Sequence, residues 1–114
     1  MKSYKSIYSE DLSLVFLDMN SDSVTRINEI VNETSYTSCY AYYLGDNDEF
    51  NFYLDDVQVS LRENKLHLKK NKFNYISIPF HKIDRVEYNS DLDDGVMELF
   101  IKNKKNPIVV NFIF

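Results

Sequence analysis

The feature that most constrains the fold is a series of short alternating segments running from residue 50 to the end of the chain, densest over residues 66–88 (LHLKKNKFNYISIPFHKIDRVEY). Apolar and polar side chains alternate along these segments, which is the period of a β-strand with one buried face. The 114 residues include only two glycines and two prolines, so Asn, Asp, Ser and Lys must make most of the turns. The pattern predicts a single mainly β (α+β) domain over residues 1–114. We expect an antiparallel meander that forms a partly open barrel or a curved sheet, with one helix near the N-terminus.

The registers of three hairpins follow from counting residues outward from their turns. We expect Asp55 and Asp56 to form the first turn, residues 62–65 (RENK) the second with Asn64 in a left-handed conformation, and residues 103–106 (NKKN) the third. A slip of one residue would turn an apolar set to the opposite face. On these registers apolar residues oppose one another on one face: Phe50 with Leu61, Phe52 with Val59, Leu54 with Val57, Leu61 with Leu66, Val59 with Leu68, Met97 with Phe112, Leu99 with Val110 and Ile101 with Ile108.

The stretch between the second and third hairpins is interrupted once. Residues 69–72 are expected to form a polar loop, and the alternation over residues 74–80 indicates a strand. Residues 79–82 (PFHK) then interrupt the period-two pattern, and the next apolar residues, Ile83 and Val86, are three residues apart, which predicts one tight helical turn before a strand at residues 84–88. Residues 89–95 (NSDLDDG) follow as a polar connection, because their acids do not match the positions of a calcium-binding loop.

The front half predicts a strand, a helix and a second strand. The apolar run at residues 12–19 (LSLVFLDM) favours a buried strand. Ser21 is expected to cap the helix that follows, with Asp22 in the first turn where the helix dipole favours an acid. One side of this helix carries an apolar stripe formed by Val24, Ile27, Ile30 and Val31.

Residues 36–44 (YTSCYAYYL) have a small odd-numbered face and a large, mostly tyrosine, even-numbered face. We expect the helix to pack on the small face, which leaves the tyrosines on the other. These rings either cap the core with their hydroxyls in water or form a rigid surface for protein contact. Together with the acids that follow, they give the candidate partner-binding residues Tyr36, Tyr40, Tyr42, Asp46, Asp48 and Glu49.

The net charge of −5 is unevenly distributed along the chain. Residues 1–60 hold eleven acids against three bases, a balance of −8, whereas residues 61–114 hold seven acids against ten bases, a balance of +3. Such an asymmetry can steer the approach of a charged partner. An overall negative charge disfavours binding of nucleic acid.

No residue pattern indicates a reaction, a cofactor or a metal site. Cys39 is the only cysteine and cannot form an internal disulfide, so nothing indicates an oxidising compartment. His67 and His81 have no zinc-ligand spacing with Cys39, and no local motif supports a Cys–His nucleophile pair. The first twelve residues lack the apolar core of a signal peptide, and no run reaches the ~18 apolar residues of a membrane span. These features predict a cytoplasmic, non-catalytic protein.

The run ENKLHLKKNKFNYISIPFHKIDRVEY followed by GVMELFIK resembles bacterial pleckstrin-homology-like and GRAM-type domains. In that family an Asn-Lys-Leu turn leads into a hairpin, followed by an Ile-Pro corner and two further strands. The corner residues here are Ile78, Pro79, Phe80, Ile83 and Val86. The resemblance covers about half the chain. The helix that closes the family's barrel after the last strand has no counterpart behind Phe114, so we expect the front helix to replace it or the sheet to stay open.

The resemblance implies a platform that binds proteins or lipid headgroups. Its lipid-binding members use basic loop residues, for which the counterparts here are Lys65, Lys69, Lys70 and Lys72, and separately Lys102, Lys104 and Lys105. With a net charge of −5 we do not expect binding to anionic membranes.

Two functions are consistent with the sequence. The first is an intracellular protein-interaction module that binds through a sheet edge or through the tyrosine face. The last segment, PIVVNFIF, is apolar on both faces, so a homodimer formed through this C-terminal strand is also expected. The alternative is an acidic inhibitor or immunity-type protein that neutralises a basic partner, such as a toxin or a nucleic-acid enzyme, with an association rate that falls as salt rises.

Overall fold

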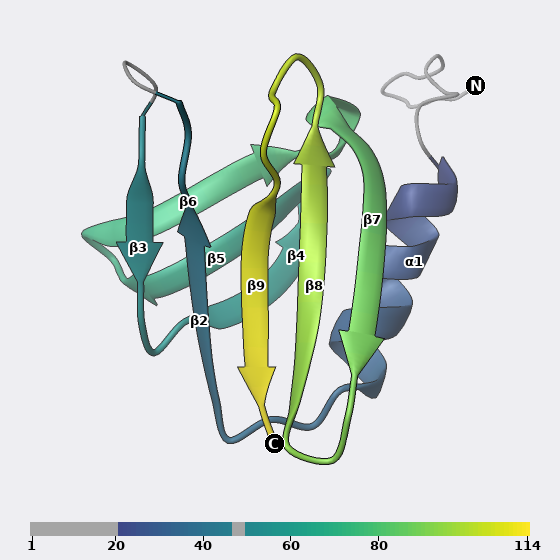
Figure 1. The fold of residues 1–114 in the computed structure, drawn as a ribbon, viewed down its shortest axis with the longest axis vertical. Coiled ribbons are helices and arrows are strands. Elements are labelled where there is room, and N and C mark those ends of the chain that lie inside the picture. The colour runs from purple at the N-terminus through teal and green to yellow at the C-terminus, as the bar shows by residue number, and fades with distance from the viewer. Residues whose placement is uncertain (1–20, 47–49) are drawn as a thin grey trace.

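The computed structural model describes residues 21–46 and 50–114, which form two antiparallel β-sheets and one α-helix (Figure 1). The mainly β class is confirmed, and the sheets are open and curved instead of closing into a barrel. The strand expected at residues 12–19 and the capping side chain of Ser21 lie outside the described part of the chain.

The five-stranded sheet has the order β3-β2-β9-β8-β7. Its strands are β2 (Ser38–Tyr43), β3 (Phe52–Leu54), β7 (Ile83–Ser90), β8 (Asp94–Ile101) and β9 (Ile108–Ile113). The second sheet has the order β4-β5-β6, with β4 (Gln58–Arg62), β5 (Lys65–Asn71) and β6 (Asn74–Pro79). In Figure 1 the five-stranded sheet stands in front, and the three-stranded sheet and helix α1 (Ser21–Glu33) lie behind it.

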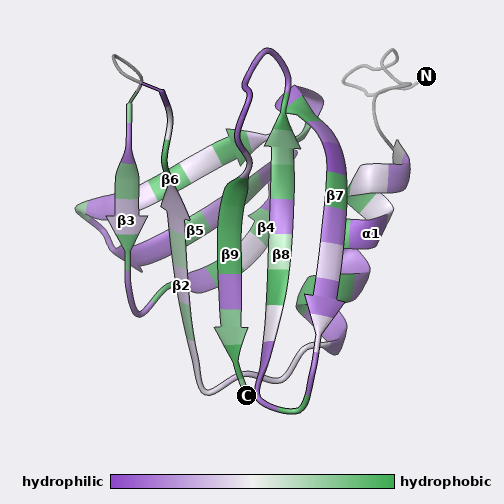
Figure 2. Cartoon of the chain, in the orientation of Figure 1, coloured by the Kyte–Doolittle hydropathy of each residue, from purple (hydrophilic) through white to green (hydrophobic). Residues whose placement is uncertain are grey.

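The core lies between these layers, and strand alternation decides which residues enter it. In Figure 2 apolar and polar residues alternate along most strands, whereas β9 is apolar over most of its length. Inward-facing residues of the central strands are fully buried, which removes their apolar surface from water at roughly 25 cal/mol per Å². The largest fully buried side chains are Ile27, Cys39, Leu66, Leu68, Ile83, Met97, Leu99, Val110 and Phe112.

Helix α1 is confirmed, but the face expected to receive it is wrong. Its apolar stripe buries Ile27 and Ile30, yet it packs against β7 and, less extensively, β4, instead of β2. The small residues Cys39 and Ala41 of β2 share their core with Leu66 and Leu68 of the second sheet. The expectation assumed a single meander, whereas the three-stranded sheet covers the small face of β2.

The first expected hairpin is wrong. β3 pairs with β2, with Tyr42 opposite Tyr53 and Tyr43 opposite Phe52, and makes no hairpin with β4. Asp55 and Asp56 instead lie where the chain crosses from one sheet to the other. Phe52 still packs on the core as expected, because its side chain faces inward whether β3 pairs with β2 or with β4.

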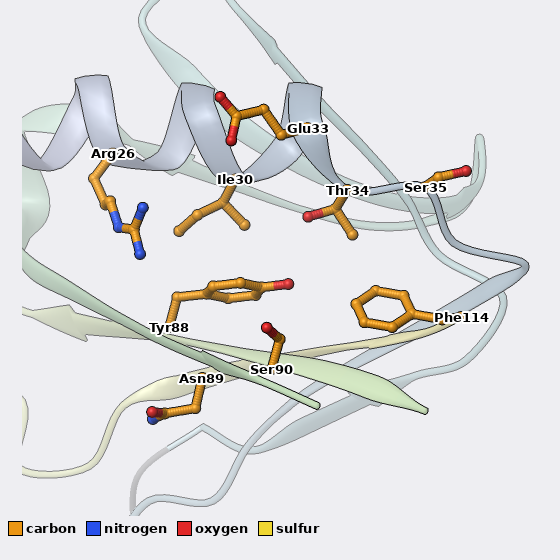
Figure 3. A pocket seen from close by; sticks show the side chains of 9 residues that line it. All are labelled: Arg26, Ile30, Glu33, Thr34, Ser35, Tyr88, Asn89, Ser90 and Phe114. Atoms are coloured by element: carbon orange, nitrogen blue, oxygen red, sulfur yellow. The ribbon is translucent and has the colours of Figure 1, made fainter. Parts of the chain in front are cut away.

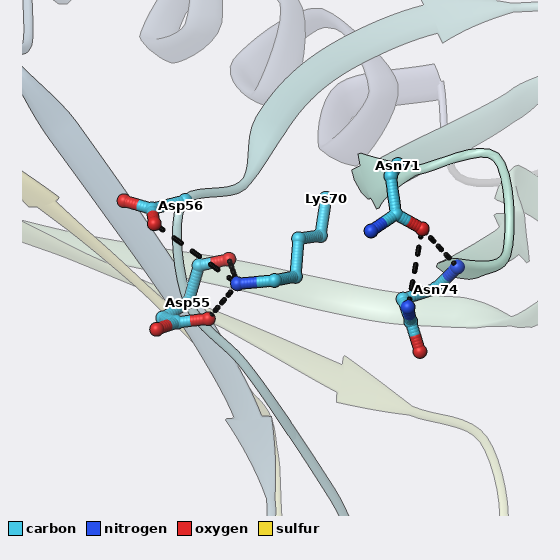
Figure 4. A network of polar contacts seen from close by, with 5 residues as sticks. All are labelled: Asp55, Asp56, Lys70, Asn71 and Asn74. Atoms are coloured by element: carbon cyan, nitrogen blue, oxygen red, sulfur yellow. Dashed lines mark hydrogen bonds and ion pairs between the residues drawn. The ribbon is translucent and has the colours of Figure 1, made fainter.

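A lysine on the second sheet connects to this crossing (Figure 4). The Nζ of Lys70 donates to the carboxylate of Asp55, and it lies 4.0 Å from Asp56 Oδ2. The contact thus joins β5 to the segment that leaves β3. Asp56 has a positive φ of 52°, which lets the chain change direction there.

The second hairpin is confirmed in register. Leu61 lies opposite Leu66 and Val59 opposite Leu68. Asn64 has a φ of 60°, as expected, and Glu63 before it has a φ of 57°. Two consecutive left-handed residues match the twist that a two-residue hairpin turn requires.

β5 continues further than expected, since residues 69–71 belong to the strand and not to a loop. The side chain of Asn71 explains the tight turn that follows. Its Oδ1 accepts hydrogen bonds from the backbone nitrogens of Phe73 and Asn74, each at 2.9 Å (Figure 4 draws the Asn74 contacts). An Asn side chain that bonds the backbone in this way substitutes for a longer loop.

The helical turn expected after β6 is confirmed as the 3₁₀ helix η1 (Phe80–Lys82). Phe80 is buried, and its backbone nitrogen donates to the carbonyl of Asn64 at 3.0 Å, so the corner docks on the second hairpin turn. The strand expected at residues 84–88 is observed as the longer β7.

The third hairpin exists, but its expected register is wrong by two residues. Leu99 lies opposite Ile108 and Met97 opposite Val110. Because side chains alternate with period two, this shift leaves the same residues in the core. Asn103 has a φ of 65°, and the longer connection between the strands absorbs the two residues.

Candidate protein-binding surface

Three tyrosines lie together on the outward face of the five-stranded sheet, at its β3 edge. The rings of Tyr40 and Tyr42 are stacked with centroids 6.4 Å apart, and the rings of Tyr40 and Tyr53 are 5.9 Å apart. Tyr53 is 62% exposed, and Tyr40 and Tyr42 are half-buried. We call Tyr40, Tyr42 and Tyr53 the tyrosine surface.

The backbone register explains this grouping. Residues Cys39, Ala41 and Tyr43 of β2 point into the core, so the intervening tyrosines must point outward. Tyr42 pairs directly with Tyr53 of β3, which brings the third ring onto the same face. Tyr53 was missed from the sequence, although its alternation with Phe52 and Leu54 was visible, because β3 was expected to pair with β4.

Tyr36 does not belong to this surface. Its ring packs on the buried Phe112 at 5.1 Å between centroids, and its hydroxyl accepts a hydrogen bond from the backbone nitrogen of Val59 at 3.4 Å. It precedes β2, where strand alternation does not yet apply. Of the remaining candidate residues, Asp46 is exposed, and Asp48 and Glu49 lie outside the described residues.

The rest of the outward face differs from the tyrosine end. At the β7–β8 end the guanidinium of Arg85 lies 3.9 Å from the ring centroid of Phe100, and Arg85 Nε is 3.1 Å from Glu87 Oε2. The guanidinium of Arg85 thus covers the ring of Phe100 and is held there by the carboxylate of Glu87, so this aromatic surface is less accessible to a partner. At the tyrosine end, Leu44 directly follows β2 and is 63% exposed, whereas the exposed Phe50 (69%) lies beside Phe52 and Tyr43 on the opposite face of the sheet.

The edge of the sheet adjacent to the tyrosine surface is formed by β3. Within the described chain β3 pairs only with β2, and its three residues leave a short strand edge. Such an edge can accept an extended segment from another protein.

The C-terminal strand β9 cannot supply an edge in this arrangement, because it is paired on both sides. β2 pairs along one side of β9 and β8 along the other, so the pairing and burial that its apolar sequence indicated are supplied within the sheet. A homodimer stays a prediction, but strand-to-strand pairing through β9 is not open to it in this fold.

On the opposite side of the sheet, a groove of about 610 Å³ opens between the C-terminal part of α1 and the end of β7 (Figure 3). Arg26 points from the helix toward the ring of Tyr88, with the guanidinium carbon 5.9 Å from its centroid, and Phe114 lies at the far end. Tyr88 packs over Gly95 of β8, where an added Cβ would lie 2.2 Å from the tyrosine hydroxyl oxygen. The absence of a side chain at Gly95 therefore lets the Tyr88 ring lie against β8 and form the floor of this groove.

The cysteine and the two histidines, which are the residues best suited to catalysis or metal binding, lie on separate elements. Cys39 is buried, and this burial raises the pKa of its thiol to about 12, so it stays protonated and poorly nucleophilic. His67 lies on β5, facing away from the buried Leu66 and Leu68, and His81 is exposed in η1. Over residues 21–46 and 50–114, no group of three His, Cys, Asp or Glu side chains could hold a metal ion.

In the acidic connection between β7 and β8, the carboxylate of Asp91 bonds the backbone of the same turn. Asp91 Oδ1 accepts hydrogen bonds from the backbone nitrogens of Asp94, at 3.0 Å, and Asp93, at 2.8 Å, and these bonds lower the pKa of Asp91. Desolvation, with the nearby charge of Asp91, raises the pKa of Asp94. This arrangement is a polar turn closed by the Asp91 side chain, as expected in kind, but it is shorter than the expected connection at residues 89–95, because β7 runs to Ser90 and β8 begins at Asp94.

No protein-family model, curated protein or solved structure matches this chain. The resemblance to pleckstrin-homology-like domains therefore stays a prediction. In the portion of the chain that the structure describes, no helix has the length and apolar character needed to cross a membrane.

Proposed function

We propose that this chain is a cytoplasmic, non-catalytic protein-binding module of pleckstrin-homology-like type, and that the tyrosine surface with the neighbouring β3 edge is its binding site. The observation that supports this proposal is the gathering of three outward-facing tyrosines from two strands at a sheet edge. Tyrosine supplies a large contact area at low entropic cost and is enriched among the residues that dominate binding energy.

The partner that best fits is a protein segment carrying both basic and apolar side chains. Asp46 and Asp56 are exposed acids close in sequence to β2 and β3, and the exposed Leu44, which directly follows β2, adds apolar area. Basic side chains, Arg in particular, stack on tyrosine faces and pair with carboxylates. The segment would add to the β3 edge through backbone hydrogen bonds and place these side chains over the rings.

The test compares the wild-type protein with the triple variant Tyr40→Thr/Tyr42→Thr/Tyr53→Thr. Partners are captured from a lysate of the native cells, identified by mass spectrometry and then titrated in purified form. We expect the triple variant to weaken the affinity by at least about 30-fold, since hot-spot residues contribute ~2 kcal/mol or more. Threonine is used because its β-branched side chain suits a strand.

The matched control is Tyr75→Thr, which removes a tyrosine of similar exposure (55%) from the outward face of the other sheet. This variant should bind the purified partner with wild-type affinity. A partner that binds all three proteins equally would show that the tyrosine surface is not the site.

The acidic-inhibitor alternative receives less support from the arrangement of charges. The described acids of the front half separate into two groups, with Asp22, Glu29 and Glu33 on α1 and Asp46, Asp55 and Asp56 near β2 and β3. Figure 1 places α1 and β3 at opposite sides of the five-stranded sheet. An association rate that falls steeply with salt would nevertheless favour this alternative over tyrosine-dominated binding.

A further inference from the structure

The groove between the C-terminal part of α1 and the end of β7 plays no part in the proposed protein-binding site. Its volume of about 610 Å³ lies within the range of ~300–1,000 Å³ that is usual for small-molecule sites. In Figure 3, Arg26 and Thr34 point into it from the helix side, and Tyr88 and Ser90 point into it from β7. We call this site the α1–β7 groove.

Two aromatic rings line the α1–β7 groove. The half-buried ring of Tyr88 forms its floor, with the hydroxyl directed toward the end that holds Thr34 and Phe114 (Figure 3). The ring can lie there only because Gly95 has no side chain, since a Cβ would come within 2.9 Å of Tyr88 Cζ. Phe114 is 38% exposed and supplies a second aromatic surface. A ligand thus meets ring surfaces that packing against the sheet already holds in place.

The polar groups of the groove have few partners within the protein. The hydroxyls of Thr34, Tyr88 and Ser90 make no hydrogen bond to another described residue, and each can both donate and accept. The guanidinium of Arg26 lies 5.9 Å from the Tyr88 ring centroid, and its ion pair with the exposed Glu29 is long, at 3.8 Å. These groups are therefore available to a ligand.

The charges around the groove disfavour a charged ligand of either sign. Arg26 and Glu33 are its charged lining residues, so the lining carries no net charge. An anion at Arg26 would compete with Glu29 and approach Glu33, whereas a cation near the Tyr88 ring would be repelled by Arg26. A neutral ligand with many hydrogen-bonding groups avoids both costs.

We propose that the α1–β7 groove binds a neutral saccharide. A pyranose ring has an apolar face of C–H groups, which would pack on Tyr88 and Phe114, and a rim of hydroxyls. Each sugar hydroxyl both donates and accepts, as do the hydroxyls of Thr34, Tyr88 and Ser90, and the guanidinium of Arg26 adds further donors. An aromatic surface beside a few convergent polar groups is the arrangement that fixes the orientation of a small ligand.

The probes separate a saccharide site from a charge-driven one. Maltotriose, cellotriose and the trimer of N-acetylglucosamine are neutral, and the glucosamine and galacturonic acid trimers are their positively and negatively charged counterparts. Each is titrated by NMR of the backbone amides. We expect at least one neutral trimer to bind saturably, more tightly than both charged trimers, and to shift the amides of Thr34, Tyr88 and Ser90. Tighter binding of a charged trimer, or shifts centred on another surface, would overturn the proposal.

The deciding variant is Arg26→Ala/Ser90→Ala, which removes two exposed side chains that point into the groove. Its control is Arg85→Ala/Ser60→Ala, which makes the same chemical changes at exposed positions outside the groove. We expect the groove variant to lower the affinity for the bound trimer at least about fivefold, since each lost hydrogen bond weakens binding several-fold, and the control to lower it less than about twofold.

Equal losses in both variants, or no saturable binding of any trimer to the wild-type protein, would show that the groove is not a saccharide site. Circular dichroism confirms that both variants are folded before they are titrated. Neither variant changes a residue of the tyrosine surface, so this proposal and the proposed protein-binding function can fail independently.

Discussion

Substituting Gly95 tests the packing beneath the groove between α1 and β7. An alanine Cβ at this position would lie 2.2 Å from Tyr88 Oη, 2.9 Å from Cζ and 3.0 Å from Cε1. The backbone of Gly95 does not have a positive φ, so alanine itself introduces no backbone strain. The tyrosine ring must therefore move, and this movement withdraws it from Arg26 and from its place over β8.

Two opposing effects set the expected magnitude for Gly95→Ala. Replacing glycine in a strand interior favours folding by about 0.5–1 kcal/mol. Overpacking against a rigid ring costs about 1–3 kcal/mol, so the free energy of unfolding should fall by about 1 kcal/mol in total. In a Tyr88→Ala background the overlap is absent, and the same substitution should instead stabilise by about 0.5–1 kcal/mol.

Urea denaturation followed by far-ultraviolet circular dichroism measures all four proteins of this cycle, since the midpoint and slope of each transition follow the loss of backbone structure. The expected coupling between the two positions is about 1–3 kcal/mol. Tyr88→Phe serves as a control that removes the closest atom and leaves the ring, so it should relieve only part of the overlap. A coupling below ~0.5 kcal/mol would refute the close approach as the reason for glycine at this position.

Three further outcomes are expected. Asn111 Oδ1 is buried without a hydrogen-bond partner among the described residues, so Asn111→Val should stabilise the protein by about 1 kcal/mol in urea denaturation, and a destabilised variant would show that this oxygen is satisfied. The hydrogen bond from Lys70 lowers the pKa of Asp55, so its contribution to stability is present above the unfolded pKa of Asp55 and is lost as the pH falls through the folded one. Lys70→Gln should therefore raise the pKa of Asp55 toward its ordinary value in an NMR titration, and an unchanged pKa would contradict the contact. Cys39 should resist a thiol reagent at mildly alkaline pH until urea unfolds the protein, and immediate reaction of the native protein would contradict its burial.

The candidate protein-binding site was only partly predictable. Tyr40 and Tyr42 follow from alternation within one strand, a local property that needs no knowledge of neighbours. Tyr53 belongs to the tyrosine surface because β3 pairs with β2. Tyr36 does not belong to it, because it precedes the strand and packs on Phe112. The grouping of a site from separate segments depends on which strands become neighbours.

The α1–β7 groove depends on tertiary structure in the same way. Arg26 and Tyr88 are far apart in the sequence, and they meet because α1 packs against β7 instead of β2. Gly95 was expected at the end of a polar connection. In the structure it belongs to β8 and lies beneath the ring of Tyr88.

The sequence by itself determined the strand character of the second half, the helix, the second hairpin and the corner at Pro79, because each depends on alternation, turn residues or spacing within a short segment. Only the tertiary structure decided that β3 pairs with β2, that the last hairpin is shifted by two residues, and that α1 covers β7. The physical reason is that period-two alternation specifies which side chains face inward. Any partner strand, and any register shifted by two residues, keeps that set buried, so the choice among them is left to the packing of the whole chain.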